Sequence, residues 1–293
     1  MGLADDPAVA ELIDLAKRED LGGGDITSRL LPDPNQSARF RLVAKQDGVF
    51  AGREIAEAVA RAYHQDIAID WAASCADGAA LGGGSAIATI RGPLAAVLAA
   101  ERVMLNFLQR LCGVAARTRA FVDAIAGTGA RIYDTRKTTP GWRALEKYAV
   151  RCGGGHNHRV GLFDAVLIKD NHLAGIPPER IAYAIFDMLN RLASEGNRPS
   201  FVQVECASVG QLAELLKVVG IDSILLDNFS VEGLAAAVEL RNELGVQDKI
   251  ALEASGGITL ATVRAVAETG VERISVGSIT HSAVALDLSL DRV

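Results

Sequence analysis

The pattern of apolar and polar residues divides the chain into two regimes. Residues 7–18 are amphipathic at helical spacing, and the stretches 39–52, 65–73 and 85–93 carry short strand-like patterns separated by Gly and Asp turns. A long Ala- and Leu-rich segment at about 94–112 predicts a helix. We therefore expect an N-terminal α+β domain over residues 1–114, built on a small and mostly antiparallel sheet.

From about residue 115, apolar strand candidates alternate with helices. Six such strands are predicted, at 130–134, 164–170, 201–205, 223–227, 250–254 and 273–277. Their apolar character is typical of buried parallel strands. The 178 residues after position 115 suffice for about six βα units of roughly 30 residues, short of the roughly 250 of an eight-fold barrel. We predict an open or reduced six-stranded α/β barrel over 115–280, with a doubly wound open sheet as the alternative.

Charged or small polar residues close each predicted strand. They are Asp134 leading into Arg136 and Lys137, Lys169 with Asp170, Glu205, Asp227 with Asn228, Glu253 leading to Ser255, and Gly277. The carboxyl ends of the strands form the active-site face in parallel barrels and in open α/β sheets alike. One mouth is therefore expected to collect cations, carboxylates and glycine turns.

Charge is distributed unevenly along the chain. The net charge of the whole sequence is −6, whereas the window 131–172 holds eight Lys or Arg against four acids, a balance of +4. A local cationic patch on an anionic protein predicts a focused site for a small polyanion and not a nucleic-acid surface. Within the window, Arg143, Lys147 and Arg151 recur every four residues on a predicted helix at 142–151, which indicates a solvated or subunit-facing stripe.

The turns and carboxylates at the strand ends indicate which chemical groups of a ligand could bind there. Ser255, Gly256 and Gly257 precede a predicted helix, where backbone N–H groups favour the binding of phosphate, and Gly277 could form a second side of the same phosphate site. Alternatively, both glycine turns are only short connections between a strand and a helix. Glu205 and Asp227 could hold sugar hydroxyls, share a Mg²⁺ or stabilise positive charge at an anomeric carbon, or could be salt-bridge partners of the basic residues.

The cations nearest to the strand ends and to the triple glycine are Arg136, Lys137, Arg159 and Lys169. Guanidinium groups bind planar carboxylates in bidentate fashion, whereas lysines act as point charges for phosphate oxygens. The segment GGGHNHR also places two histidines, at 156 and 158, beside an arginine, which favours a ligand-contacting loop. Metal binding by these histidines has little support because no third ligand is evident.

The composition limits the class and the cellular location of the protein. A hydrophobic content of 49% over 293 residues is enough for a substantial core. No apolar run approaches the roughly 18 residues of a membrane span, and the acidic, amphipathic start differs from a signal peptide, so we expect a cytoplasmic protein without a membrane partner. The four cysteines lack metal-ligand spacing and are expected to be buried thiols.

Several segments together resemble one known family. They are EDLGGGDITS at 19–28, ERVMLNFLQRLCGVA at 101–115, a block from DTRKTTPGWRALEKY to VLIKDNH at 134–172, VECAS at 204–208, LLDN at 225–228, EASGGI at 253–258 and ISVGSITHSAVALDLSL at 274–290. In this order they closely resemble nicotinate-nucleotide pyrophosphorylase (carboxylating), also called quinolinate phosphoribosyltransferase. The resemblance extends through nearly the whole chain.

The resemblance implies a fold and an assembly. The fold is an N-terminal sandwich-like domain followed by a six-stranded α/β barrel of the type II phosphoribosyltransferase kind. The tail at 281–293 is expected to return to the first domain. The assembly is a homodimer or a higher oligomer. Three residues depart from the family pattern: Cys112 replaces a usual serine, Ala116 a usual threonine and Trp142 a frequent leucine.

The resemblance also implies an activity. Quinolinate and phosphoribosyl pyrophosphate give nicotinate mononucleotide, pyrophosphate and carbon dioxide, with Mg²⁺, in de novo NAD biosynthesis. Both substrates are polyanions, which agrees with a cationic mouth.

Site residues follow from the same resemblance. Quinolinate is expected to be bound by Arg136, His158, Arg159 and, across a dimer interface, Arg102. Lys137 and Lys169 are expected to face the pyrophosphate and the reacting groups. Glu205 and Asp227 match the acidic pair for ribose hydroxyls and metal, and Ser255, Gly256, Gly257 and Gly277 match the 5′-phosphate site.

Three alternative interpretations of the sequence remain. An aldolase-like lyase would use Lys169 as a Schiff-base amine, but Lys169 lies among arginines without an apolar pocket. A relative without catalysis would only bind a phosphoribosyl compound and could discard the two carboxylates. A relative associated with molybdenum transport would keep the barrel but alter the basic block.

Overall fold

The computed structural model describes residues 2–196 and 198–293, and the chain divides into two compact units. The first unit comprises Met1–Arg119, Lys137–Gly155 and Ser278–Val293. The second comprises Ala120–Arg136 and His156–Gly277. Both units are therefore discontinuous in the sequence, because the segment after the first barrel strand belongs to the first unit.

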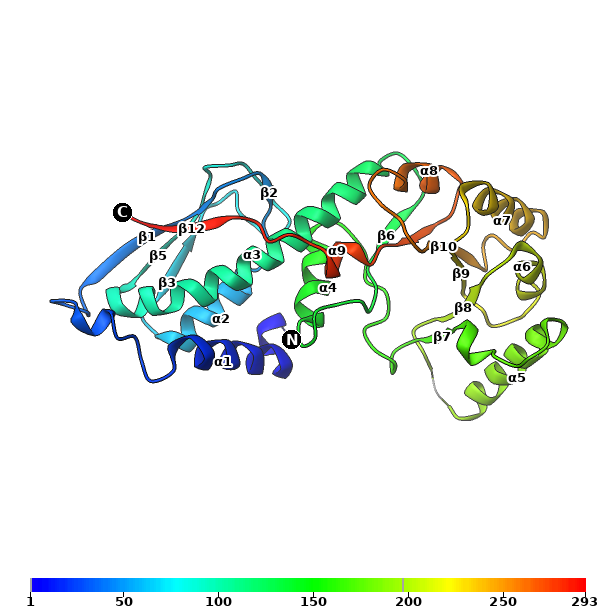
Figure 1. The fold of residues 1–293 in the computed structure, drawn as a ribbon, viewed down its shortest axis with the longest axis horizontal. Coiled ribbons are helices and arrows are strands. Elements are labelled where there is room, and N and C mark those ends of the chain that lie inside the picture. Colours follow the sequence, from blue (N-terminus) through cyan, green and yellow to red (C-terminus); the bar gives the residue numbers. More distant parts are fainter. Residues whose placement is uncertain (1, 197) are drawn as a thin grey trace. The chain divides into compact units, whose positions relative to one another are not determined.

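The first unit contains a four-stranded antiparallel sheet with the order β12-β1-β5-β3. Its strands are β1 (Ser37–Ala44), β3 (Ala68–Trp71), β5 (Ala86–Pro93) and β12 (Leu288–Arg292), and a separate pair is formed by β2 (Gly48–Val49) and β4 (Ala80–Leu81). Along β1, Ala38, Phe40 and Leu42 are buried while the residues between them are exposed, so one face of the sheet covers the core. The C-terminal strand β12 runs beside β1 (Figure 1), with Leu290 opposite Leu42.

Helices complete the first unit. They are α1 (Pro7–Leu21), α2 (Arg53–Tyr63), α3 (Leu94–Ala124), α4 (Arg143–Cys152) and α9 (Ser278–His281), with short 3-10 turns at Leu3–Asp5 and Ser28–Leu30. The predicted end of α3 near residue 112 is wrong, since the helix continues to Ala124 with its last turn in the second unit. Gly113 does not end the helix. A Cβ there would lie 2.9 Å from the carbonyl carbon of Val284, so the glycine serves close backbone packing.

The basic stripe predicted on α4 is only partly exposed. Arg151 is exposed, but Lys147 is buried, with 3% of its surface accessible. Helix α9 and the turn Leu3–Asp5 contact α4. The expectation of a solvated stripe is therefore wrong for Lys147.

The second unit is built on six parallel strands with the order β6-β11-β10-β9-β8-β7. They are β6 (Arg131–Tyr133), β7 (Val166–Ile168), β8 (Val202–Cys206), β9 (Ser223–Asp227), β10 (Ala251–Ser255) and β11 (Arg273–Ser275). The strands from β7 to β11 follow sequence order without the reversal of a doubly wound sheet. The prediction of an open six-stranded α/β barrel is confirmed, with β6 and β7 at its two edges within the described residues.

Helices cover the outside of these strands (Figure 1). They are α5 (Ile181–Ser194), α6 (Val209–Leu215), α7 (Val231–Glu243) and α8 (Val263–Glu268), with 3-10 turns at Asp170–His172 and Pro178–Arg180. The hydroxyl of Ser208 accepts the N–H of Gln211 at 3.2 Å, and that of Ser230 accepts the N–H of Gly233 at 3.1 Å. These caps fix the starts of α6 and α7. No helix in the described part of the chain combines the length and apolar character that a membrane crossing requires.

Candidate active site

The two predicted carboxylates close adjacent strands of the barrel unit. Glu205 of β8 is in register with Leu225 of β9, and Asp227 lies two residues beyond Leu225. Registered neighbours, and residues two apart, point to the same side of a parallel sheet, so both carboxylates face the barrel interior at its carboxyl edge. Oε2 of Glu205 accepts a hydrogen bond from Nζ of Lys169 at 3.0 Å, and Oδ2 of Asp227 accepts one from the Asn228 amide at 2.8 Å. The structure thus brings Lys169 and Glu205 together.

The glycine turn after β10 lines a cavity. Ser255, Gly256 and Gly257 contribute to a space of about 190 Å³, together with Ser230 and Thr262 among others. Gly256 has a φ of +97°, and a Cβ on it would lie 2.6 Å from Cγ of Asn228 and 3.1 Å from the Asn228 backbone nitrogen. A side chain at this position would clash with Asn228, so only glycine fits there. Gly277 follows β11 by two residues.

Two guanidinium groups of the second unit influence one another. Arg159 is buried, and burial, followed by the positive charge of Arg136, lowers the pKa of its guanidinium, while Asp164 opposes this shift. Asp164 itself accepts the backbone N–H groups of Val160 and Gly161, each at 2.8 Å. The Nε atom of Arg136 is buried and has no hydrogen-bond partner within the described residues. An anionic ligand would relieve both the like-charge repulsion and this unsatisfied donor.

His158 lies beside these arginines but is turned toward the barrel interior. Its Nδ1 accepts the backbone N–H of Arg159 at 2.8 Å, and its Nε2 is 2.8 Å from Oε1 of Gln203. Asp134 supports the same loop, because its carboxylate accepts the backbone N–H of His158 at 2.8 Å and the Asn157 amide at 2.7 Å. Both ring nitrogens are therefore engaged within the protein.

Near His158, Gln203 and Arg273 were not predicted as part of the site, and Glu253 was expected only as a polar residue at the end of its strand. Gln203 and Glu253 are fully buried polar residues, and Glu253 accepts hydrogen bonds from Gln203 at 3.0 Å and from Arg273 at 2.7 Å. The sequence signal was available: each is a polar residue within an otherwise apolar parallel strand, FVQVE and IALEA.

Arg102 and Lys137 belong to the first unit, whereas the other ten predicted site residues belong to the second. Arg102 is exposed on α3. Lys137 is exposed as well, and its backbone carbonyl accepts the hydroxyl of Thr280 at 2.8 Å.

The protein side chains alone do not make a full metal site. Within residues 2–196 and 198–293, no group of three or more His, Cys, Asp or Glu is arranged to hold a metal ion. The carboxylates of Glu205 and Asp227 are hard oxygen donors, which suit Mg²⁺ when substrate phosphate oxygens and waters supply the remaining ligands. The donor set therefore fits a Mg²⁺ ion that arrives with its phosphate.

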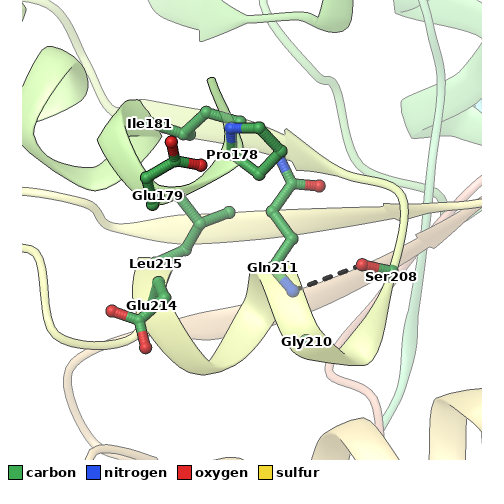
Figure 2. A pocket seen from close by; sticks show the side chains of 8 residues that line it. All are labelled: Pro178, Glu179, Ile181, Ser208, Gly210, Gln211, Glu214 and Leu215. Carbon is green, nitrogen blue, oxygen red and sulfur yellow. Dashed lines mark hydrogen bonds between the residues drawn. The ribbon is translucent and has the colours of Figure 1, made fainter. Parts of the chain in front are cut away.

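A larger cavity, of about 470 Å³, lies between α6 and the start of α5 (Figure 2). Its lining residues include Pro178, Ile181, Gln211 and Leu215. None of the predicted site residues lines it. The cavity therefore does not enlarge the candidate active site.

Comparison with known families decides the affiliation of the chain. Residues 25–112 match the model of the quinolinate phosphoribosyl transferase N-terminal domain, and residues 114–291 match that of its C-terminal domain. The chain belongs to the quinolinate phosphoribosyl transferase family.

Relatives within the quinolinate phosphoribosyl transferase family extend over nearly the full chain. A probable nicotinate-nucleotide pyrophosphorylase (carboxylating) of Bacillus subtilis is 40% identical over 93% of this chain and 89% of its own length. The nicotinate-nucleotide pyrophosphorylase (carboxylating) of Mycobacterium leprae is 39% identical over 97% of both chains. The solved structure of the enzyme from Francisella tularensis superposes with a TM-score of 0.87 at 36% identity, over 98% of this chain and 96% of that one. The fold and the family agree with the expectation from the sequence.

Proposed function

We propose that the protein is a nicotinate-nucleotide pyrophosphorylase (carboxylating). It transfers the phosphoribosyl group of phosphoribosyl pyrophosphate to quinolinate, with loss of carbon dioxide, and yields nicotinate mononucleotide and pyrophosphate for NAD biosynthesis. Family membership over residues 25–112 and 114–291 supports this activity.

The observation that carries the proposal is the pair Arg136 and Arg159. Each places a positive charge near the other, and Nε of Arg136 is buried without an acceptor in the described residues. Two guanidinium groups in one part of the second unit suit the two adjacent carboxylates of quinolinate, because each guanidinium can bind one carboxylate in bidentate fashion. His158 adjoins them, and Arg102 is proposed to add a third guanidinium from a second subunit.

The phosphoribosyl donor is proposed to lie across the carboxyl ends of β7 to β11. The turn Ser255–Gly257 and Gly277 hold the 5′-phosphate through backbone N–H groups. Glu205 and Asp227 bind the ribose hydroxyls. Lys137 and Lys169 contribute positive charge toward the pyrophosphate, and the 3.0 Å contact with Glu205 holds the ammonium of Lys169 at this edge.

The transfer of the phosphoribosyl group then depends on where these charged side chains lie. As the bond between ribose C1 and pyrophosphate breaks, the carboxylates of Glu205 and Asp227 stabilise the positive charge developing on the ribose. The lysines stabilise the negative charge gathering on the leaving group. The pyridine nitrogen, oriented by the arginines, forms the new bond to C1. When bound with the pyrophosphate, Mg²⁺ would add neutralising charge near Glu205 and Asp227.

Decarboxylation needs no further side-chain nucleophile. Once the ring nitrogen is substituted, the bond from the adjacent ring carbon to its carboxylate breaks and its electron pair stays on that carbon. The neighbouring pyridinium nitrogen stabilises this pair, and a proton completes nicotinate mononucleotide. The protein contributes orientation, because the arginines hold the second carboxylate, which is retained.

The assembly and location are part of the same proposal. A homodimer is proposed, in which Arg102 completes the site of the partner subunit, and the expected location is the cytoplasm. Light scattering of the purified protein tests the oligomer, and cell fractionation tests the location.

The activity is tested with purified protein, Mg²⁺, phosphoribosyl pyrophosphate and either quinolinate or nicotinate. The expected result is nicotinate mononucleotide and carbon dioxide in equal amounts from quinolinate alone, with loss of turnover when EDTA removes the metal. Binding of the substrates without turnover would contradict the proposal and support a non-catalytic relative.

The lyase alternative gains no support from the site. A Schiff-base lysine must be neutral to attack a carbonyl, which requires an apolar pocket or a neighbouring cation. Nζ of Lys169 instead lies 3.0 Å from a carboxylate, and the side chain is 46% exposed. Borohydride with a carbonyl substrate is therefore expected to trap no adduct at Lys169.

A further inference from the structure

Four polar side chains form a continuous chain of contacts inside the barrel unit. Nε of Arg273 on β11 donates to Oε2 of Glu253 on β10 at 2.7 Å, and Nε2 of Gln203 on β8 donates to the same oxygen at 3.0 Å. Oε1 of Gln203 lies 2.8 Å from Nε2 of His158. Gln203 and Glu253 have no exposed surface, and His158 is 8% exposed.

The contacts of His158 determine which ring nitrogen carries the proton. The backbone N–H of Arg159 can only donate, so Nδ1 of His158 must accept it. The proton of the neutral ring is then on Nε2, which donates to Oε1 of Gln203. The amide of Gln203 is left as the donor to Glu253. With the ring neutral, each of these contacts joins one donor to one acceptor.

The charges around the ring agree with this assignment. Oε1 of Glu253 is 3.5 Å from Nε2 of His158, and Asp134 accepts the backbone N–H of His158. The charge of Glu253 is balanced by Arg273, whose guanidinium also lies 3.8 Å from the ring centre of Tyr133. The remaining neighbouring charge is that of Arg159, a cation. A charge on His158 is therefore not needed to balance Glu253.

The direction in which the Arg159 side chain points depends on the position of its backbone. Its guanidinium makes one hydrogen bond to the described part of the chain, from Nη1 to the carbonyl of Ala165 at 3.4 Å, which is long for such a bond. The bond from its N–H to His158 is shorter, at 2.8 Å. The His158 ring also packs on the ring of Phe201, with the two ring planes nearly perpendicular and their centres 5.2 Å apart. The ring is thus held from three sides, and it holds Arg159.

We propose that Gln203, Glu253 and Arg273 are positioning residues for the dicarboxylate substrate. They fix the ring of His158, and Nδ1 of His158 fixes the backbone of Arg159 so that its guanidinium meets a substrate carboxylate. His158 then acts through Arg159 and not by touching the substrate. This inference rests on the proposed function, because it takes Arg159 to bind quinolinate.

The test is Gln203→Met, which keeps the volume but removes both hydrogen bonds. The KM for quinolinate is expected to rise about tenfold to a hundredfold, the loss that follows misalignment of one charge-assisted hydrogen bond. The kcat and the KM for phosphoribosyl pyrophosphate are expected to change by less than about twofold, and Gln203→Glu is expected to restore part of the KM. The matched control is Ser275→Ala, since Oγ of Ser275 is buried on β11 without a hydrogen-bond partner in the described residues.

An unchanged or lower KM for quinolinate in Gln203→Met would overturn the proposal, because it would mean that quinolinate binding does not depend on the contacts that hold the His158 ring. A second measurement requires neither turnover nor the Gln203→Met variant. In ¹⁵N NMR of the wild-type protein without ligands, His158 is expected to show a proton on Nε2 and a bare Nδ1. A proton on Nδ1 would refute the proposed chain of hydrogen bonds around His158. Absence of quinolinate turnover in the wild type would instead refute the proposed function, and the NMR result would then still decide whether the chain of hydrogen bonds holds the His158 ring as described.

Discussion

Nζ of Lys169 lies 3.0 Å from Oε2 of Glu205, so the ends of β7 and β8 are joined by an ion pair at the edge where the substrates are proposed to bind. The side chain of Lys169 is 46% exposed and that of Glu205 is 13% exposed. The pair is thus accessible to a ligand from the side of the lysine. A phosphate group arriving there would compete with Glu205 for the ammonium.

The first prediction concerns Glu205. Glu205→Gln keeps the shape of the side chain but removes the charge that is proposed to stabilise the developing positive charge on the ribose. The kcat is expected to fall about 10²- to 10³-fold, the usual cost of removing one group that stabilises transition-state charge. Steady-state kinetics with both substrates saturating measure the effect. Glu214→Gln is the control, because Glu214 is also paired with a lysine but is 56% exposed on α6. Equal kcat values for the two variants would contradict the role of Glu205.

Gly256 gives a second prediction. Gly256→Ala would place a methyl group against Asn228 and would also impose a left-handed backbone, with φ at +97°, on a residue that rarely adopts it. The turn is expected to move, and the KM for phosphoribosyl pyrophosphate is expected to rise at least about tenfold, from roughly 1–3 kcal/mol of backbone strain. The KM for quinolinate is expected to change little. Gly245→Ala is the control, since Gly245 has a φ of +66° with no atom within 4 Å of the added Cβ. A similar result for both variants would show that strain alone matters.

The sequence predicted the barrel well because its signals are local. Each parallel strand is a short apolar run, and caps such as Ser208 and Ser230 mark the following helices. The end of α3 was missed for a non-local reason. Gly113 reads as a helix end, but the approach of Val284, far along the chain, is what requires a residue without a side chain there.

The candidate site was predicted in part, for a similar reason. Lys169 and Glu205 stand at strand ends, where sequence position alone indicates the functional face, and the structure brings them together. Gln203 and Arg273 were missed because they lie within strands, and Glu253 was expected only as a strand-end residue without its partners. Their partners are set by which side of each strand faces inward and by the register of β8, β10 and β11. A buried glutamate in an apolar strand indicates that a partner exists, but it does not identify the partner.

A third prediction concerns stability. Glu146 of α4 is fully buried, and its carboxylate accepts from Nη2 of Arg110 at 2.6 Å and from the Thr139 hydroxyl at 2.9 Å. Arg110 also donates to the carbonyls of Thr280 and Ala283, each at 2.7 Å. Arg110→Ala would leave a buried carboxylate without its partner and is expected to lower the free energy of unfolding by about 3–5 kcal/mol.

Urea denaturation measures this loss, provided that the m-value is unchanged. Lys45→Ala is the control in the same unit, because Lys45 and Asp291 form a solvent-exposed pair at 3.2 Å. Its loss is expected to cost less than about 1 kcal/mol. If both variants lose the same small amount, the buried pair does not stabilise the fold as proposed.

The cysteines allow a fourth prediction. All four are free thiols; Cys75, Cys112 and Cys206 are buried, as expected from the sequence, whereas Cys152 is only partly buried, so the expectation is wrong for Cys152. Burial raises the pKa of Cys112 to about 12 and that of Cys75, Cys152 and Cys206 to about 11. Since the thiolate is the reactive form, Ellman's reagent at pH 8 is expected to label none of them quickly in the native protein and all four in denaturant.

The same shifts link stability to pH. A thiol with a folded pKa above its unfolded value of about 8.5 binds its proton more tightly in the folded state. The contribution to stability is therefore complete below about pH 8.5 and is lost as the pH rises toward 11 to 12. The Tm is expected to fall between about pH 8 and pH 10.5, and to fall less in Cys112→Ser. A fast-reacting thiol in the native protein would contradict both expectations.

The last prediction concerns Arg102, which is exposed on α3 and is proposed to complete the site of a partner subunit. Arg102→Ala should raise the KM for quinolinate and Glu205→Gln should lower the kcat, so each homodimer is impaired. In a mixed dimer made from the two variants, one site receives both defects and the other receives neither. Activity is therefore expected to return when the two impaired proteins are unfolded, mixed and refolded, up to about a quarter of the wild-type value for random pairing.

The control for this experiment is a mixture of Glu205→Gln with Asp227→Asn, two changes proposed to affect the same site from the same chain. That mixed dimer has two defective sites, and no activity should return. If Arg102 served its own subunit, mixing Arg102→Ala with Glu205→Gln would likewise leave one defect in every site and give no recovery. Recovery in the first mixture and not in the second therefore requires that Arg102 and Glu205 of one active site come from different chains.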